Sequence, residues 1–128
     1  MIVIDASVLY EALLGSVAAS DRLSEERLFA PELVDVEFMN SLRKSIRRKI
    51  ITKRRADEAL ENYAETYIVR FPMRQFMDRA WELRDNVTPY DAMYVALAEW
   101  FEVPLVTTDA KLAGASGIKA SVEVVPVG

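Results

Sequence analysis

The stretch MIVIDASVLYEALLG (residues 1–15) joins a short apolar run to a helical pattern. The apolar run Met1–Asp5 is too short for a helix and is rich in β-branched side chains, so it predicts a β-strand that ends in a carboxylate. Ser7 is expected to cap a short helix over Val8–Leu14, which Gly15 ends. A strand therefore passes directly into a helix at the start of the chain.

The same alternation of short apolar runs and helical patterns continues along the sequence. Further strands are predicted at 27–30, 67–71, 103–109 and 122–127, and helices at 17–26, 31–49, 74–86 and 88–100, with one more after a cap at Thr52. Inward-facing positions are predicted in three of these helices: Val34, Phe38, Leu42 and Ile46; Ala56, Leu60, Tyr63 and Tyr67; and Phe76, Ala80 and Leu83 or Arg84.

Strands that alternate with helical crossovers predict an α/β fold. Such crossovers give a parallel sheet that is covered by helices on both faces and joined by right-handed connections. The 128 residues contain no internal repeat, low-complexity segment or linker, so we expect a single domain over 1–128. Neither GxGxxG nor GxxxxGK[ST] occurs, so the sequence does not predict nucleotide binding by a glycine-rich loop.

The composition narrows the possible chemistry, because the chain contains neither cysteine nor histidine. This excludes a disulfide framework, a thiol nucleophile, a Cys/His zinc site and a Ser-His-Asp triad. Hydrolysis by this protein must therefore use carboxylates, hydroxyls, lysines or metal ions bound through oxygen. For oxygen ligands the natural ions are Mg²⁺ and Mn²⁺.

The sequence predicts a cytoplasmic protein with no membrane segment. No apolar run approaches the ~20 residues that span a bilayer. The first ten residues lack a basic region and carry the carboxylate of Asp5, so they do not resemble a secretory signal.

One segment is strongly basic although the net charge is −4. In RKSIRRKIITKRR (Arg43–Arg55), 8 of 13 residues are Lys or Arg, which is half of the 16 in the chain. The segment is either a solvated helix face followed by a turn, or a patch that meets a polyanion such as RNA.

Acidic residues follow two of the predicted strands. Asp5 ends the first strand and Asp109 ends the strand in VPLVTTD, and ligands of parallel sheets bind beyond these carboxyl ends. Asp91 lies in the first turn of the helix that leads into the second of these strands. Glu37 lies in the first two turns of the helix predicted over 31–49. The fold is therefore able to bring four carboxylates to one cleft.

Each acid also has a structural alternative. Asp91 completes a capping box with Thr88, Asp109 caps a short turn, Asp5 fixes the strand-to-helix turn, and Glu37 is a solvated helix residue. As a set, carboxylates about 4 Å apart repel by about 4 kcal/mol per pair at an effective dielectric constant of 20, and a divalent cation relieves this repulsion. The hydroxyls of Ser7 and Thr107, each two residues from an acid, are suited to orient these ligands.

Taken together, four motifs resemble those of the PIN-domain ribonucleases, and within them the VapC-type toxins of toxin–antitoxin pairs. The motifs are IVIDASVL, PELVDVEFMNSLRK, TPYDAMYVALAE and LVTTDAKL, and they occur in this order across essentially the whole chain. An acid after a strand is common, so the signal lies in the register of all four motifs.

The resemblance implies a three-layer α/β/α PIN-like fold whose central parallel sheet has about five strands in the order 3-2-1-4-5. It also implies hydrolysis of RNA with Mg²⁺ or Mn²⁺, a homodimer, and a cognate antitoxin partner whose tail enters the cleft. The implied metal ligands are Asp5, Glu37, Asp91 and Asp109, with Ser7, Asn40 and Thr107 beside them. Lys111 stands where some relatives carry another acid, which leaves open whether one ion binds or two.

In this interpretation the RNA backbone follows the basic side of the cleft, with Arg43, Lys44, Arg47 and Arg48 as contacts. Other interpretations are a PIN-fold module that binds RNA or a partner with little cleavage, a receiver-like signalling domain, and a glycosidase with a carboxylate pair. A receiver-like domain needs an acid at the end of a middle strand, whereas the strand at 67–71 ends in Phe71 before Pro72. A glycosidase needs a sugar-stacking cluster, which the sequence does not offer.

Overall fold

The computed structural model describes residues 1–127 and contains a five-stranded parallel sheet in the order β3-β2-β1-β4-β5. The strands are β1 Ile2–Ile4, β2 Leu28–Pro31, β3 Ile68–Phe71, β4 Leu105–Thr107 and β5 Val122–Val124. The amino-terminal strand β1 is central, because Val3 pairs with both Phe29 of β2 and Leu105 of β4. The predicted fold class and strand order are confirmed.

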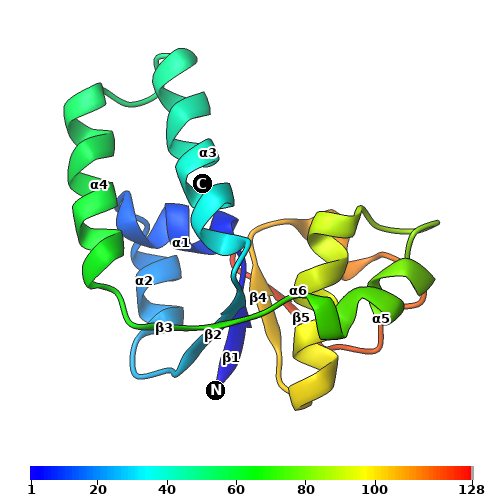
Figure 1. Ribbon diagram of the computed structural model, residues 1–128. Helices are drawn as coiled ribbons and strands as arrows, with labels where there is room; N and C mark the ends of the chain where they lie inside the picture. The colour runs from blue at the N-terminus through cyan, green and yellow to red at the C-terminus, as the bar shows by residue number, and fades with distance from the viewer. Residues whose placement is uncertain (128) are drawn as a thin grey trace.

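Helices cover both faces of this sheet. They are α1 Ala6–Leu13, α2 Val17–Leu23, α3 Val34–Arg47, α4 Lys53–Glu65, the 3₁₀ turn η1 Arg74–Phe76, α5 Met77–Glu82, α6 Pro89–Phe101 and α7 Ala110–Ala113. Helices α1–α4 lie on one side of the sheet, and α5 and α6 lie on the other (Figure 1). None of the helices in residues 1–127 is both long and apolar enough to cross a membrane.

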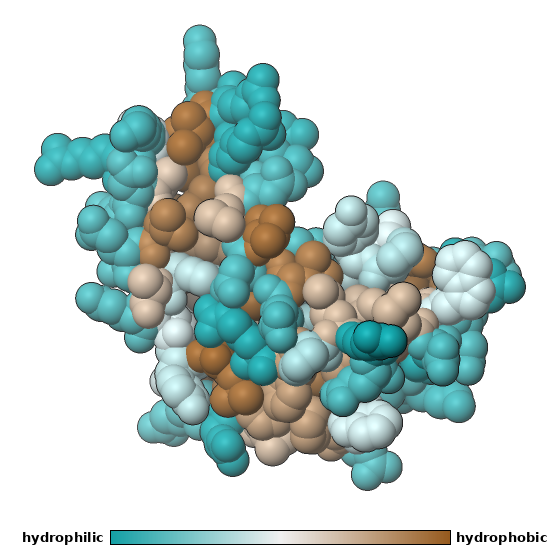
Figure 2. Space-filling view, viewed as in Figure 1, coloured by the Kyte–Doolittle hydropathy of each residue, from teal (hydrophilic) through white to brown (hydrophobic). Residues whose placement is uncertain are grey.

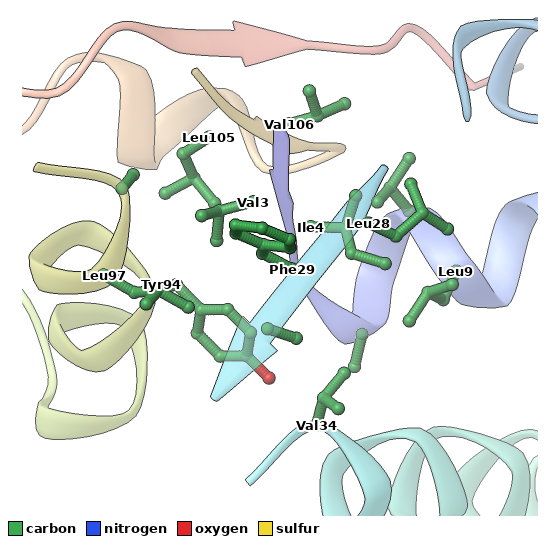
Figure 3. Close-up of a cluster of buried hydrophobic side chains, with 14 of the residues drawn as sticks. Val3, Ile4, Leu9, Leu28, Phe29, Val34, Tyr94, Leu97, Leu105 and Val106 are labelled. Atoms are coloured by element: carbon green, nitrogen blue, oxygen red, sulfur yellow. The ribbon is translucent and has the colours of Figure 1, made fainter. Parts of the chain in front are cut away.

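The core forms where α6 packs on the central strands (Figure 3). Every residue of β1 and β4 is buried, as expected for parallel strands that are covered on both faces. Five consecutive residues of α6, Tyr94–Ala98, are also buried. The small Ala96 and Ala98 let this helix approach the sheet closely, so the start of α6 is held firmly near the end of β1.

Two long helices, α3 and α4, form an arm that projects from the sheet (Figure 1). In Figure 2 hydrophilic side chains cover the outside of this arm, and apolar atoms show between its helices. Phe38 of α3 is fully buried and stacks on the Tyr63 ring of α4, with ring centroids 4.2 Å apart. The arm is therefore held together by its own small core.

The predicted inward face of α4 is wrong at two positions. Leu60 is 40% exposed and Tyr67 is 82% exposed, whereas Ala59 is fully buried beside Ala56 and Tyr63. Helix α4 ends at Glu65 and Thr66 already has an extended backbone, so Tyr67 no longer follows the helical period.

Three predicted helix limits are also corrected. Asp5, not Ser7, caps α1, because its carboxylate accepts the Val8 amide. Pro31 belongs to β2, so α3 begins only at Val34 and ends at Arg47. The helix predicted over 74–86 is divided into η1 and the short α5, although Phe76, Ala80 and Leu83 are buried as predicted.

Replacing Phe38 by Ala is expected to lower the free energy of unfolding by about 3–5 kcal/mol, since it removes a buried ring and leaves a cavity inside the arm. Urea denaturation followed by circular dichroism measures this change. Val36→Ala is the matched control, because Val36 is on the same helix and is 62% exposed; we expect it to change stability by less than about 0.5 kcal/mol. Equal effects of the two substitutions would contradict the packing described for Phe38.

Candidate metal centre

Asp5 lies directly after β1 and is 8% exposed, so its position is fixed by the central strand. Its carboxylate accepts hydrogen bonds from the Val8 amide at 3.1 Å, the Ser7 hydroxyl at 2.6 Å and the Thr107 hydroxyl at 2.5 Å. Thr107 is the last residue of β4, the parallel neighbour of β1. The two strand ends are thus joined through one buried carboxylate.

Ser7 and Thr107 also position the residues after β4. The Ser7 hydroxyl accepts the Thr108 amide at 3.1 Å, and the Thr107 hydroxyl accepts the Asp109 amide at 3.1 Å. Asp109 caps α7 by accepting the Lys111 amide at 2.9 Å, so the structural role considered for this acid is observed. Since one lone pair of one oxygen serves the cap, the exposed carboxylate keeps further acceptor capacity.

Glu37 reaches the same region from α3, on the other side of the sheet from α6. Its Oε1 accepts the hydroxyl of Tyr94 at 2.6 Å. Tyr94 belongs to α6 and is 1% exposed. This contact fixes the half-buried Glu37 carboxylate and connects the two helical layers.

Tyr94 is a site residue that sequence reasoning missed, although its sequence position held a signal. It lies three residues after Asp91, hence on the same face of the helix, and it is the one residue with a polar tip between Ala92 and Ala98. A buried tyrosine usually finds a hydrogen-bond partner for its hydroxyl. Glu37 is that partner here.

Asp91 lies in the first turn of α6, where Thr88 caps the helix by accepting the Asp91 amide at 3.2 Å. The reciprocal bond of a capping box, from the Thr88 amide to the Asp91 carboxylate, is not among the hydrogen bonds of residues 1–127. The capping box is therefore only half formed. Thr88 caps α6 through the Asp91 amide, and its side chain also hydrogen-bonds the half-buried Asp91 carboxylate, which lines the cleft.

All four acids line one cleft of about 230 Å³ at the carboxyl ends of the central strands. The other residues that line it are Ala6, Ser7, Asn40, Ser41, Lys44 and Tyr94. In Figure 2 the surface is hollowed between the α3–α4 arm and the start of α6. The structure thus brings the four predicted ligands together, with two of the predicted neighbours, Ser7 and Asn40, at their side; Thr107 is fully buried beneath them.

The electrostatics of this cleft disfavour ionised carboxylates. Burial raises the pKa of Asp5, against its hydrogen bonds to Ser7 and Thr107. Burial also raises the pKa of Glu37, and the charges of Asp91 and Asp5 add to this effect. The pKa of Asp91 is raised by burial and then by Asp5 and Asp109. The mutual repulsion of the acids is the effect that a bound cation removes.

The donor set fits Mg²⁺ or Mn²⁺, because it consists of carboxylate and hydroxyl oxygens without nitrogen or sulfur. Within residues 1–127 no group of three or more acids is arranged so that it could hold a metal ion. Mg²⁺ usually keeps several waters and takes only one or two carboxylates from a protein.

The predicted RNA contacts divide into two groups. Lys44 lines the acidic cleft, and Arg48 lines an adjoining cleft that Lys44 shares. Lys44 lies on the face of α3 that carries Glu37, and Arg48 is the C-cap residue that follows α3. Arg43 and Arg47 are exposed and point about 80–120° away from this face, at 3.6 residues per helical turn. Their contact with RNA stays a prediction.

The fold and the cleft belong to a known class of protein. A model of the PIN domain matches residues 2–117, and the chain therefore belongs to the PIN domain family. It is similar to the VapC ribonuclease Mb0985 of Mycobacterium bovis, with 37% identity over 126 residues that cover 98% of this chain and 99% of the relative. Ribonuclease VapC12 of Mycobacterium tuberculosis is 37% identical over 128 residues, with 98% and 99% covered.

The fold is also found in solved structures. A chain from a toxin–antitoxin complex of Klebsiella pneumoniae superposes with a TM-score of 0.73, at 18% identity and with 98% of each chain covered. At this identity the likeness supports the fold alone.

Proposed function

We propose that the protein is a metal-dependent endoribonuclease, the toxin of a type II toxin–antitoxin pair. The observation that carries this proposal is the single cleft at the end of β1 lined by Asp5, Glu37, Asp91 and Asp109. Full-length similarity to proteins named VapC ribonucleases supports RNA as the substrate.

Mg²⁺ or Mn²⁺ would be held by these four acids, with Asp5 as the most rigid ligand. When bound, such an ion supplies an activated water and stabilises charge on the phosphate and the leaving oxygen. Ser7 and Thr107 hold the Asp5 carboxylate in place through their hydroxyls. The Tyr94 hydroxyl orients Glu37, and its pKa is raised well above its usual range by burial and by Glu37, so it remains a hydrogen-bond donor.

The proposal includes three partners and a compartment. RNA passes over the acids next to Lys44, a cognate antitoxin occupies the same cleft in the silenced complex, and two copies of the chain form a homodimer. Cleavage of cellular RNA places the protein in the cytoplasm.

Cleavage of a mixed-sequence single-stranded RNA tests the proposal. We expect cleavage with Mn²⁺ or Mg²⁺, and none with EDTA. Internal cuts in an RNA blocked at both ends identify an endonuclease. If Mn²⁺ binds but no RNA is cut over a broad panel of sequences, the protein is a binding module and the enzymatic proposal fails.

The Asp91→Asn substitution separates catalysis from helix capping. Because the cap uses the backbone amide of Asp91, the substitution leaves it intact, and the melting temperature should not fall. Cleavage should fall at least about 100-fold, because a carboxylate ligand is lost. Ser16→Ala is the control for the loss of a helix cap: it removes the cap of α2, lowers stability by about 1 kcal/mol, and should leave most of the activity. Full activity in Asp91→Asn would remove Asp91 from the metal site.

A further inference from the structure

The acidic cleft continues into a second cleft on the side of α5 and α7. This second cleft has a volume of about 430 Å³ and shares Asp91 and Asp109 with the first. It is lined by residues 84–89, 111, 112 and 115 in addition to these acids. Its lining includes two exposed cations, Arg84 and Lys111, and a third acid, the exposed Asp85.

A third cleft adjoins the acids on the opposite side, between α1 and α3. It has a volume of about 220 Å³ and shares Ser7, Ser41 and Lys44 with the acidic cleft. Arg48 also lines it. We refer to these three adjoining clefts together as the groove; Lys44 and Arg48 line it on one side of the acids, and Arg84 and Lys111 line it on the other.

The four groove cations have no acidic partner in residues 1–127, a property that they share with other surface cations such as Arg43 and Arg47. Among residues 1–127 no carboxylate lies within 4.0 Å of Lys44, Arg48, Arg84 or Lys111. By contrast, Lys53 pairs with Asp57 at 3.2 Å. Unpaired cations on both sides of an acidic centre are suited to a polyanion whose chain continues in both directions.

Contacts with Trp81, near the end of α5, orient the Arg84 side chain. Its guanidinium donates to the Trp81 carbonyl at 2.9 Å and lies 4.9 Å from the centre of the Trp81 ring. These contacts restrain the side chain and leave the other guanidinium hydrogens free to meet a phosphate. Lys111 follows Asp109 closely, and its amide is fixed by the Asp109 carboxylate. The Arg84 side chain and the Lys111 backbone are thus held in place beside the cleft that contains Asp91 and Asp109.

We propose that Arg84 and Lys111 form a second phosphate-binding site, which holds the RNA backbone on the side of the scissile bond opposite to Lys44 and Arg48. The substrate is then a single strand, or an unpaired loop, that passes through the groove and extends beyond the cut on both sides. This inference rests on the proposed ribonuclease function. Because this second site binds phosphates, it raises the affinity for RNA without adding a preference for sequence.

The salt dependence of cleavage tests the second phosphate-binding site. For single strands, each phosphate contact contributes about 0.7 to the slope of log affinity against log salt concentration. Arg84→Gln/Lys111→Gln should therefore lower the slope of kcat/KM by about 1.4, and raise KM by roughly tenfold with kcat changed by less than about twofold. Arg27→Gln/Lys119→Gln is the control of equal charge, because both residues are exposed and lie outside the groove and the basic segment Arg43–Arg55.

Two failures are distinguishable in this experiment. If the wild type cleaves RNA but Arg84→Gln/Lys111→Gln keeps the wild-type slope, the proposed second phosphate-binding site is wrong and the ribonuclease proposal stands. If the wild type neither binds nor cleaves RNA, both the proposed function and the second phosphate-binding site are wrong. An equal reduction in slope for the control variant would also contradict the second phosphate-binding site, because the slope would then depend only on the total charge of the protein.

Shortened substrates test whether the two pairs of cations act on opposite sides. RNA truncated on one side of the cleavage site should become insensitive to Arg84→Gln/Lys111→Gln and remain sensitive to Lys44→Gln/Arg48→Gln. Truncation on the other side should give the reverse. If one truncation removes both sensitivities, all four cations contact the same side, which contradicts the proposal.

Discussion

Asp5→Asn is expected to lower metal-dependent RNA cleavage by at least about 10³-fold, a change in activation free energy of about 4 kcal/mol. Asp5 is the most buried of the four acids and the one whose position is fixed by three hydrogen bonds. An asparagine there offers one oxygen in place of two and carries no charge. Steady-state cleavage rates at saturating Mn²⁺ measure the loss.

The control for this substitution is Asp57→Asn, which makes the same chemical change on the exposed surface of α4. It should leave the cleavage rate within about twofold of wild type, because Asp57 and its ion-pair partner Lys53 are both exposed and such surface pairs contribute little. Circular dichroism and the melting temperature show that Asp5→Asn is folded. An active, folded Asp5→Asn protein would exclude this residue from the metal site.

The second large effect concerns stability, which should depend on Mn²⁺ in a way that changes with pH. The pKa values of Asp5, Glu37 and Asp91 are raised above the usual 3.8 for Asp and 4.5 for Glu. In the metal-free protein these acids contribute stability below their unfolded pKa values, and this contribution is lost as pH rises through the raised values. Mn²⁺ binds the ionised acids, so its stabilising effect must grow over the same interval.

At neutral pH and a free Mn²⁺ concentration of 100 times Kd, the ion should add about 2.7 kcal/mol and raise the melting temperature by on the order of 10 °C. Thermal unfolding with Mn²⁺ and with EDTA, from pH 4 upward in steps of about one unit, gives this difference directly. Comparing the two conditions at each pH cancels acids outside the cleft, such as Asp35, whose pKa is lowered first of all by its bonds to Arg70. Asp5→Asn should lose most of the Mn²⁺ effect. A Mn²⁺ effect that is independent of pH would show that the ion binds elsewhere.

The sheet and the gathering of the acids were predictable from local patterns. Short apolar runs that end in an acid place Asp5 and Asp109 at the carboxyl ends of parallel strands, and parallel pairing brings such ends together. Glu37 and Asp91 followed from helix starts next to those strands. Since each of these inferences needs only a few neighbouring residues, errors of one or two residues at the helix ends did not affect them.

The contacts between distant residues were not predictable in the same way. The bond from Tyr94 to Glu37 spans 57 residues, and nothing near either residue indicates its partner. The exposure of Leu60 and Tyr67 depends on how the α3–α4 arm projects from the sheet, which the helical period does not contain. The groove was not predictable from the sequence either, because Arg84 and Lys111 are distant in sequence from Arg43–Arg55, the segment whose composition indicates a basic patch.

The central position of β1 has a consequence for the synthesis of this protein. β1 is synthesised before its neighbour β4, and the two strand ends are separated by about one hundred residues, since Asp5 and Thr107 are 102 positions apart. Until β4 is made, one edge of the central strand is unpaired, and both Thr107 and Asp109 are missing from the cleft. In a protein with the proposed ribonuclease activity, the nascent chain therefore lacks a complete metal centre until β4 and the residues after it have been made.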